Sequence, residues 1–310
     1  MALRRHGLEH RAFLYSGVEN FLSTTVPFLV KGLEADDAVV AVVRRPNLDA
    51  LRDVLGPDGD VGFYDSAEFY DHPVRTLKRY LELVDGMRPR RVVALAEPVW
   101  HWTDQRQTLE WARYESLINK VFADSGARAL CPYDRDGLSS AVLDFARHTH
   151  PVLFDGRIDH ENDRYMDPQV FGAGCDVGRR FEGRPDTAEY MAVHDEDLHP
   201  LRVFVGKHAE AHGLDRQQAQ NLVTAANEVA ANALQHGVPP MGVWVWRDGD
   251  ELVCEVGDNG FWQPSPLIGF IPPESARERG FGLWTVRLLV DLMELRAGWD
   301  GTFVRLHVSR

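Results

Sequence analysis

The chain has 310 residues, a length that predicts two domains, each large enough to bury its own hydrophobic core. Its formal net charge is −13 and it contains no long run of Lys or Arg. This argues against direct binding of nucleic acid, because an acidic surface repels the phosphate backbone. The three cysteines lie far apart and form no CxxC pair, so we expect no disulfide framework and a reducing compartment.

No segment of the sequence is suited to membrane insertion. The first fifteen residues lack the apolar core of a signal peptide. Apolar stretches such as Ala38–Val43 are far too short to span a bilayer. We therefore expect a cytoplasmic protein that makes no membrane contact.

Strands and helices alternate through the first half of the chain. Apolar, β-branched runs predict buried strands at 38–43, 61–64, 91–96 and 127–131. Helical spacing of apolar residues predicts helices at 47–55, 73–87, 104–124 and 139–148. Because such alternation produces right-handed βαβ units, we expect an α/β domain with a parallel sheet over residues 1–153.

The stretch 154–187 interrupts this alternation. It is rich in turn-forming residues, as in FGAGCDVGRRFEGRP, and predicts a linker. The second domain then covers 188–310.

The second domain has a different order of elements. Helices are predicted at 197–212 and 215–236, and strands at 241–246, 251–256, 293–297 and 302–308. A loop rich in Pro and Gly at 258–280 and a helix at 281–292 separate the two strand pairs. We expect Asp215 to cap the second helix and Gly237 to end it. This order predicts a mixed sheet with helices on one face.

The helix of the second domain with the sequence NEVAANALQHG carries two polar groups suited to a nucleotide site. Glu228 and Asn232 are four residues apart and share one helical face, among alanines that allow a ligand to approach. A carboxylate can orient a hydroxyl group, and a carboxamide oxygen can bind Mg²⁺. Alone, the pattern is better explained as a polar patch on an alanine-rich core helix.

Three turns in the same domain carry further groups of this kind. Asp258 ends an apolar strand and can accept a hydrogen bond from an exocyclic amine, while Gly260 lets the backbone pass beneath a flat ring. Gly280 and Gly282 open a helix whose free N–H groups can bind phosphate oxygens. Thr302 begins the last strand, where its hydroxyl can reach a base edge. Taken singly, DNG is a common turn signal and one GxG is weak evidence.

The order and spacing of these motifs over residues 195–308 resemble the GHKL ATPase superfamily, and most of all the RsbW-type anti-sigma factor serine kinases. The resemblance implies a Bergerat α/β sandwich that binds ATP and Mg²⁺, with Glu228 as the general base and Asn232 as the Mg²⁺ ligand. The other nucleotide-binding residues that it implies are Asp258, Gly260, Gly280, Phe281, Gly282, Leu283 and Thr302.

The same resemblance implies a STAS-domain anti-sigma antagonist as the phosphorylated partner, a sigma factor as a second partner, and a homodimer. Gln235 departs from the pattern, because many relatives carry Lys or Arg there to touch phosphate, so Arg277 or Arg279 would have to substitute. The lid, FWQPSPLIGFIPP, is apolar and stiffened by proline. Its aromatic residues Phe261 and Trp262 either pack over the nucleotide or form a partner surface.

The first half resembles the MEDS sensory domain of DcmR-type regulators over residues 8–153, through EHRAFLYSGVENFLSTTVPFLVKGLEADDAVVAVV and RALCPYD. His10 and Tyr15 match a His-to-Tyr feature near the start of that family, and a packing role for His10 is favoured over a ligand role. No glycine-rich Walker A sequence is present, so we expect no phosphate-hydrolysing P-loop here.

Other histidines have simpler explanations. His208 and His212 have zinc-ligand spacing without a third ligand, which favours a solvated helix face. His148 and His150 flank a helix end, where histidine complements the helix dipole.

Together, these observations predict a two-domain regulator with an N-terminal sensory α/β domain and a C-terminal serine kinase domain. Three alternatives stay open for the second domain. The first is a non-catalytic switch that uses ATP to order its lid and select partners. The second is a histidine-kinase relative, and the third is a ligand-binding scaffold that binds no ATP.

Overall fold

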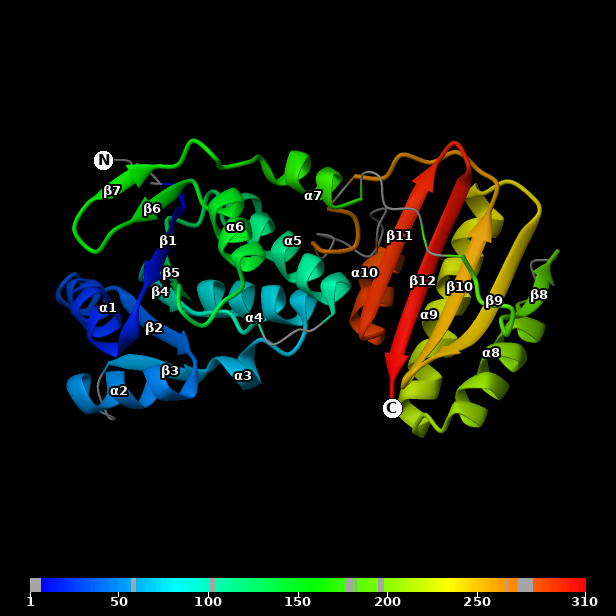
Figure 1. The fold of residues 1–310 in the computed structure, drawn as a ribbon, viewed down its shortest axis with the longest axis horizontal. Coiled ribbons are helices and arrows are strands. Elements are labelled where there is room, and N and C mark those ends of the chain that lie inside the picture. The colour runs from blue at the N-terminus through cyan, green and yellow to red at the C-terminus, as the bar shows by residue number, and fades with distance from the viewer. Residues whose placement is uncertain are drawn as a thin grey trace. The chain divides into compact units, whose positions relative to one another are not determined.

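The computed structural model describes residues 7–56, 60–100, 104–176, 181, 183–194, 198–265, 267–271 and 281–310. The chain divides into two compact units, Met1–Cys175 and Asp176–Arg310, each built on its own sheet (Figure 1). The boundary after Cys175 lies within the stretch 154–187 that the sequence predicts as a linker.

The first unit contains a seven-stranded sheet with the strand order β3-β2-β4-β5-β1-β6-β7. The strands are β1 Glu9–Tyr15, β2 Ala38–Val43, β3 Val61–Asp65, β4 Val92–Ala96, β5 Arg128–Asp134, β6 Val152–Phe154 and β7 Asp159–Glu161. All neighbours are parallel except β6 and β7. Every residue of β2 and β4 is buried, as expected of parallel strands covered on both faces. The predicted parallel α/β sheet is confirmed.

Helices cover both faces of this sheet. They are α1 Gly17–Glu34, α2 Arg45–Leu55, α3 Ser66–Phe69, α4 Pro73–Gly86, α5 Gln105–Val121, α6 Ser140–Thr149 and α7 Pro168–Asp176. Phe21 of α1 and Leu48 of α2 pack in one core cluster with β2. Leu77 of α4, Trp111 of α5 and Val142 of α6 form another cluster on the opposite face. The sheet is therefore doubly wound.

The chain between residues 152 and 176 has regular structure of its own. It forms the β6–β7 hairpin and helix α7, whose Phe171 and Cys175 pack on Ala112 of α5. Arg113 of α5 donates a hydrogen bond of 3.1 Å to the Gly172 carbonyl. The residues up to Cys175 are thus part of the first unit.

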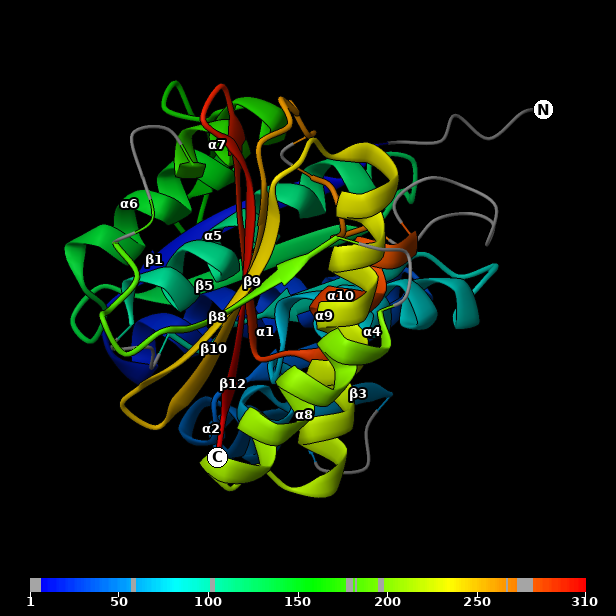
Figure 2. The ribbon, with the colours of Figure 1, turned by 90° about the vertical axis from the view of Figure 1, so that its right-hand side faces the viewer.

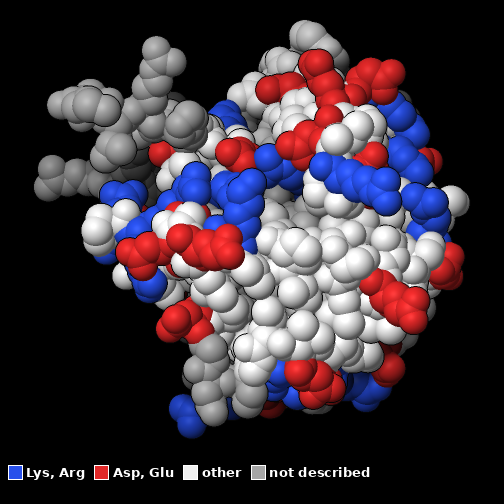
Figure 3. Space-filling model, turned by 90° about the vertical axis from the view of Figure 1, so that its left-hand side faces the viewer, with Lys and Arg blue, Asp and Glu red and all other residues white. Residues whose placement is uncertain are grey.

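Charge is unevenly distributed on the surface of the first unit. Figure 3 shows one face on which Lys, Arg, Asp and Glu gather in a band, beside a broad area with few charged side chains. Helix α1 has a similarly low charge, since Glu19, Lys31 and Glu34 are the charged residues among its 18. Across the described part of the chain, no helix is both long and apolar enough to cross a membrane.

The second unit contains a five-stranded sheet with the order β11-β12-β10-β9-β8. Its strands are β8 Glu189–Val193, β9 Met241–Asp248, β10 Glu251–Asp258, β11 Leu292–Gly298 and β12 Gly301–Ser309. Its helices, α8 His199–His212, α9 Arg216–His236 and α10 Phe281–Leu289, lie on one face of the sheet (Figure 2). The prediction of helices on one face is confirmed.

The prediction of a mixed sheet is wrong, because all neighbouring strands described in this sheet are antiparallel. The reason lies in the connection through α10. A strand–helix–strand crossover leaves β10 and β11 pointing the same way, but β12 returns between them and pairs with both. No parallel pair is then formed.

Local signals fix the ends of the two long helices. Gly213 ends α8 in the left-handed conformation with φ of 90°. Asp215 caps α9 as predicted, in a capping box in which its carboxylate accepts from the Gln218 N–H at 2.7 Å and the Gln218 side chain accepts from the Asp215 N–H at 2.9 Å.

The sheet face of the second unit away from its helices carries a charged and aromatic cluster. Glu255 of β10 is 1% exposed and accepts hydrogen bonds from Arg184, at 2.7 Å, and from Arg305. The Arg184 guanidinium lies 3.5 Å from the ring centroid of Trp244, and that of Arg305 lies 5.1 Å from Trp246. The two tryptophans therefore pack against arginines of the same unit.

Candidate functional site

A cavity of about 690 Å³ lies in the second unit, among α9, the end of β10, the start of α10 and the start of β12. Its described lining is Val229, Asn232, Ala233, Gln235, His236, Gly237, Val256, Asp258, Gly260, Phe261, Trp262, Ile268, Gly282, Leu283, Thr302 and Val304. This volume is within the usual range of small-molecule sites, about 300 to 1,000 Å³. The sequence predicts that six of these residues bind nucleotide, namely Asn232, Asp258, Gly260, Gly282, Leu283 and Thr302.

Helix α9 supplies the polar groups on one side of the cavity. Asn232 lines it, and Glu228 lies one turn earlier on the same helix. Glu228 lies against the backbone of α10, since a Cβ atom placed on Gly282 would be 3.0 Å from its carboxyl carbon. Neither side chain hydrogen-bonds to another described residue. Both polar groups are therefore free to bind a ligand.

Asp258 holds the turn at the end of β10 and also faces the cavity. It is 5% exposed, and its Oδ1 atom accepts hydrogen bonds from the N–H groups of Gly260, at 2.6 Å, and Val238, at 3.2 Å. No described residue donates to its other oxygen, Oδ2. One carboxylate oxygen thus orders the turn, and the other remains available as an acceptor.

Thr302 joins this turn to the neighbouring strand. It is the register partner of Asp258 in the β10–β12 ladder, and its hydroxyl donates to the Gly260 carbonyl at 3.2 Å. The preceding residue, Gly301, has φ of +116° and lies so close to the Asp258 carbonyl that a side chain would collide with it. The three predicted residues Asp258, Gly260 and Thr302 therefore form one hydrogen-bonded corner.

Gly282 and Leu283 belong to the first turn of α10 and line the cavity next to α9. The N-terminus of a helix offers free N–H groups and a partial positive charge, which suits phosphate. Gly280, Arg277, Arg279 and the side chain of Phe281 lie outside the described residues.

The described wall of the cavity contains no Lys or Arg, and Gln235 lies in it. Phe261 and Trp262 of the predicted lid also line the cavity and are 55% and 36% exposed. The centroid of the Phe261 ring lies 4.5 Å from that of Trp299, with the two rings tilted by 30°, and Trp299 is 89% exposed. This rim therefore presents exposed aromatic surface next to the cavity mouth.

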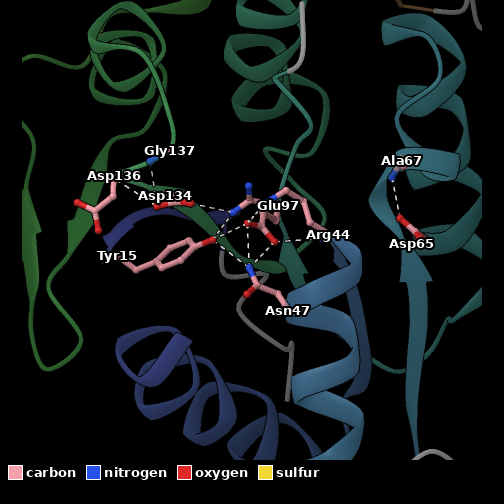
Figure 4. A network of polar contacts seen from close by, with 9 residues as sticks. All are labelled: Tyr15, Arg44, Asn47, Asp65, Ala67, Glu97, Asp134, Asp136 and Gly137. Atoms are coloured by element: carbon pink, nitrogen blue, oxygen red, sulfur yellow. Dashed lines mark hydrogen bonds and ion pairs between the residues drawn. The ribbon is translucent and has the colours of Figure 1, made fainter. Parts of the chain in front are cut away.

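The first unit has a buried polar network at the carboxyl ends of four parallel strands (Figure 4). The Tyr15 hydroxyl donates to Glu97 at 2.8 Å and accepts from Arg44 at 2.6 Å. Arg44 also donates to Glu97, at 2.8 Å, and Asn47 donates to Glu97 at 2.9 Å. Burial and the Glu97 charge raise the pKa of Tyr15, so the phenol stays protonated.

This network lies at the edge where α/β sheets usually bind ligands. Arg44 further donates to Asp134, at 3.2 Å, so every charge in the network has an opposite partner. Tyr15 therefore has a hydrogen-bonding role within the fold. Sequence patterns gave no signal for Arg44 or Glu97, which are isolated residues that follow separate strands. Asp134, the last residue of β5, entered only as part of the motif RALCPYD.

Four other histidines have partners in the structure, and the solvated helix face expected for His208 and His212 is wrong for His212, which is 5% exposed. His208 lies 3.4 Å from Glu189, while His212 Nε2 is 3.0 Å from the Asp250 carbonyl, so these two side chains have separate partners. His10 is buried, with Nδ1 3.0 Å from Asn119 Oδ1. His150 Nδ1 lies 2.9 Å from the Ala146 carbonyl in the last turn of α6.

Comparison with protein families gives a separate result for each unit. Residues 9–151 match the MEDS domain, the MEthanogen/methylotroph, DcmR Sensory domain. Residues 191–308 match the histidine kinase-like ATPase domain. The chain carries a MEDS domain followed by a histidine kinase-like ATPase domain. Both resemblances seen in the sequence are confirmed at the level of these domains.

Solved structures similar to parts of this chain include three from bacteria. The RsbU and RsbW domains of Rv1364c from Mycobacterium tuberculosis are 16% identical over 40% of this chain and 32% of that chain, with a TM-score of 0.30. This chain therefore spans about a third of that protein. The histidine kinase AdeS from Acinetobacter baumannii is 12% identical over 39% of this chain and 67% of its own, with a TM-score of 0.25.

The histidine kinase domain of the E. coli osmosensor EnvZ is 18% identical over 41% of this chain and 92% of its own, with a TM-score of 0.23. Among curated proteins, none matches this chain.

Proposed function

We propose that the ATPase domain binds ATP with Mg²⁺ in the 690 Å³ cavity and transfers the γ-phosphate to a serine of a STAS-domain anti-sigma antagonist. The observation that carries this proposal is the gathering of Asn232, Asp258, Gly282 and Thr302 around one cavity, with Glu228 one turn from Asn232. These groups come from two helices and two strands, so their convergence is a property of the fold and not of one local motif.

The adenine end of the nucleotide is assigned to the corner formed by Asp258, Gly260 and Thr302. Asp258 Oδ2 accepts a hydrogen bond from the exocyclic amine, because Oδ1 is already occupied by backbone donors. The Thr302 hydroxyl lies next to Gly260 and contacts the base edge. The cavity walls Val256 and Val304 provide apolar surface for the ring.

The phosphate end is assigned to α9 and α10. Asn232 is the residue that would hold Mg²⁺, because its amide lines the cavity without a partner among the described residues. The N–H groups at the start of α10 bind phosphate oxygens. When bound, the metal ion neutralises phosphate charge. The described lining contains no Lys or Arg that could do this instead.

Glu228 is assigned the role of general base toward the serine hydroxyl. Its carboxylate takes the hydroxyl proton as the serine oxygen bonds to the γ-phosphorus, and the bond from phosphorus to the bridging oxygen breaks, which releases ADP. Glu228 is free of described hydrogen bonds and is held against the Gly282 backbone, which limits where its carboxylate can lie.

The proposal extends to regulation. The MEDS domain, a sensory domain by its family description, controls the kinase in response to a signal, and the kinase also sequesters a sigma factor and forms a homodimer. One observation favours a second candidate. The described cavity wall lacks Lys and Arg and contains Gln235, which suits a non-catalytic switch that binds ATP only to select partners.

Phosphotransfer distinguishes these candidates. The full chain is incubated with γ-labelled Mg-ATP and a panel of STAS-domain proteins, beside a Glu228→Ala variant and a Glu210→Ala control on an exposed face of α8. A serine kinase gives acid-stable label on a STAS protein that is lost in Glu228→Ala and kept in the control. ATP binding without transfer supports the switch, and acid-labile label on the chain itself supports a histidine-kinase relative.

A further inference from the structure

Four metal-ligating side chains meet in the core of the MEDS domain. They are His10 of β1, Glu115 of α5, Cys131 of β5 and His150, which follows α6. All four are at most 3% exposed, and their ligating atoms all lie within 4.8 Å of one another. They are brought together by four separate elements and take no part in the proposed nucleotide site.

The distances within this cluster suit a tetrahedral ion. Cys131 Sγ lies 3.4 Å from His10 Nε2, and Glu115 Oε2 lies 3.8 Å from His150 Nε2. Ligands at about 2.0 to 2.3 Å from a tetrahedral zinc ion are roughly 3.3 to 3.8 Å from each other. Small side-chain movements therefore suffice to surround an ion.

The outer nitrogen of each imidazole is held by an oxygen, which fixes its tautomer. His10 Nδ1 is 3.0 Å from Asn119 Oδ1, and His150 Nδ1 is 2.9 Å from the Ala146 carbonyl. The Asn119 amide orientation is itself fixed, because its Nδ2 donates to the Thr149 carbonyl at 2.7 Å. Both Nδ1 atoms must then carry the hydrogen, which leaves each Nε2 lone pair directed at the cluster. Metal-binding histidines are oriented in this way.

One atom of the cluster is left without a hydrogen bond. The His150 side chain is 0% exposed, yet its Nε2 atom has no hydrogen-bond partner among the described residues. A buried nitrogen in this condition normally has a ligand or an ordered water. A cavity of about 50 Å³ adjoins the cluster and is lined by His10, Glu115 and Cys131 together with three tyrosines. The cluster therefore has both an unused acceptor and nearby space.

The charges of the cluster match a divalent cation. Burial raises the pKa of Glu115 to about 8 and also raises that of Cys131, while it lowers the pKa of His10 to about 4. A thiolate and a carboxylate together balance a charge of +2, after the thiol and the carboxylic acid each release a proton to solvent.

We propose that His10 Nε2, Cys131 Sγ, His150 Nε2 and a Glu115 oxygen bind one divalent transition-metal ion of the zinc class in tetrahedral geometry. Thiolate and imidazole ligands favour such ions over Mg²⁺ and Ca²⁺. The site is closed by four protein ligands and lies in the core, so it couples metal occupancy to the stability of the MEDS domain.

Cobalt titration of the full chain, after treatment with a chelator, tests this site. We expect one Co²⁺ per chain, with the visible bands of tetrahedral cobalt and a near-ultraviolet thiolate-to-cobalt band, and displacement by Zn²⁺. Cys131→Ser removes the thiolate band. Cys175→Ser and Cys254→Ser are matched controls, since both residues are buried free cysteines outside the cluster, and both keep the band.

A second variant keeps the test decisive if Cys131→Ser does not fold. Glu115→Gln has the same shape without the charge, and we expect it to keep the thiolate band while it weakens Co²⁺ binding at least about tenfold. The absence of a thiolate band in the wild-type chain would overturn the proposal. Three further results would also overturn it: a thiolate band that survives in folded Cys131→Ser, unchanged Co²⁺ affinity in Glu115→Gln, or loss of Co²⁺ binding in His208→Ala.

Discussion

At the scale of single residues, the proposed function gives the two carboxylate oxygens of Asp258 separate tasks. Oδ1 orders the turn through the N–H groups of Gly260 and Val238, and Oδ2 is left for a ligand. Because the two tasks belong to different atoms, a substitution can remove one and keep the other.

Asp258→Asn makes this separation testable. The Asn oxygen can still accept from the two backbone donors, but the amide nitrogen would replace Oδ2 and place a donor opposite the adenine amine. We expect ATP affinity to fall at least about tenfold, which corresponds to about 1.4 kcal/mol, with little change in melting temperature. Calorimetric titration with Mg-ATP measures this. Asp248→Asn, at the exposed end of β9, is the control, and equal affinity in the two variants would contradict the assignment.

Gly282→Ala tests the contact between α9 and α10. A Cβ atom there would lie 3.0 Å from the Glu228 carboxyl carbon and 3.2 Å from its Cγ, so the carboxylate must move. We expect phosphotransfer to slow by about 10² or more, the usual contribution of a general base, while the unfolding free energy changes little. Gly298→Ala is a matched control, because a Cβ there meets nothing within 4 Å. Unchanged phosphotransfer in Gly282→Ala would show that Glu228 does not need its present position.

Sequence reasoning at this scale could group residues only where they lie close together along the chain. Glu228 and Asn232 share one helix, and each glycine or Asp of the site lies in a short turn motif. The clusters of the MEDS domain have no such local pattern. His10 and Cys131 are 121 residues apart, and Tyr15 and Glu97 are 82 apart. Their proximity is created by the sheet order, so the sequence alone did not predict it.

At the scale of helices and strands, most elements followed from the spacing of their apolar residues, but strand β1 and helix α1 were not predicted. Strand β1 occupies the interior of its sheet but contains Glu9 and Arg11, which form ion pairs with each other and with Arg128 and Asp159. The sequence does not reveal these ion-pair partners, because Arg128 and Asp159 come close to β1 only when the strands pair. The short strand β8, which carries exposed residues, was likewise not predicted.

The charged cluster on β10 makes a stability prediction. Glu255→Ala would leave Arg184 and Arg305 close together without the buried anion that joins them. We expect the unfolding free energy to fall by about 3 kcal/mol, as is typical when one partner of a buried ion pair is removed. Guanidinium unfolding measures the change. Glu189→Ala, whose side chain is 63% exposed, should change it by less than about 0.5 kcal/mol, and a similarly small change for Glu255→Ala would refute a stabilising role.

The start of α9 supports the proposed site from a distance. Asp215→Ala removes the acceptor for the Gln218 N–H and opens the capping box. We expect a loss of about 1 kcal/mol in unfolding free energy, with ATP affinity nearly unchanged because the cap lies far along the helix from Asn232. Gln217→Ala, in the same turn but not part of the capping box, is the control. Equal stability of the two variants would contradict the role of the cap.

At the scale of the whole molecule, the chain joins two domains with separate cores and separate polar centres. The division into two domains followed from the change in strand and helix order along the sequence, and the ATPase character of the second followed from its resemblance to the GHKL superfamily. The end of the first unit did not follow from the sequence, because the chain after Phe154 is rich in turn residues. There, β7 pairs with β6, which pairs with β1, and α7 packs on α5. In this account, the MEDS domain provides the sensory part and the ATPase domain provides the output.

The measurement that bears most directly on this account is the melting temperature of the full chain with and without Mg-ATP, for the wild type and Asn232→Ala. Ligand at 100 times its dissociation constant adds about 2.7 kcal/mol, which raises the melting temperature of a domain of this size by several degrees. We predict such a rise in the wild type and its loss in Asn232→Ala. No rise in the wild type, or an equal rise in both proteins, would contradict nucleotide binding at this cavity.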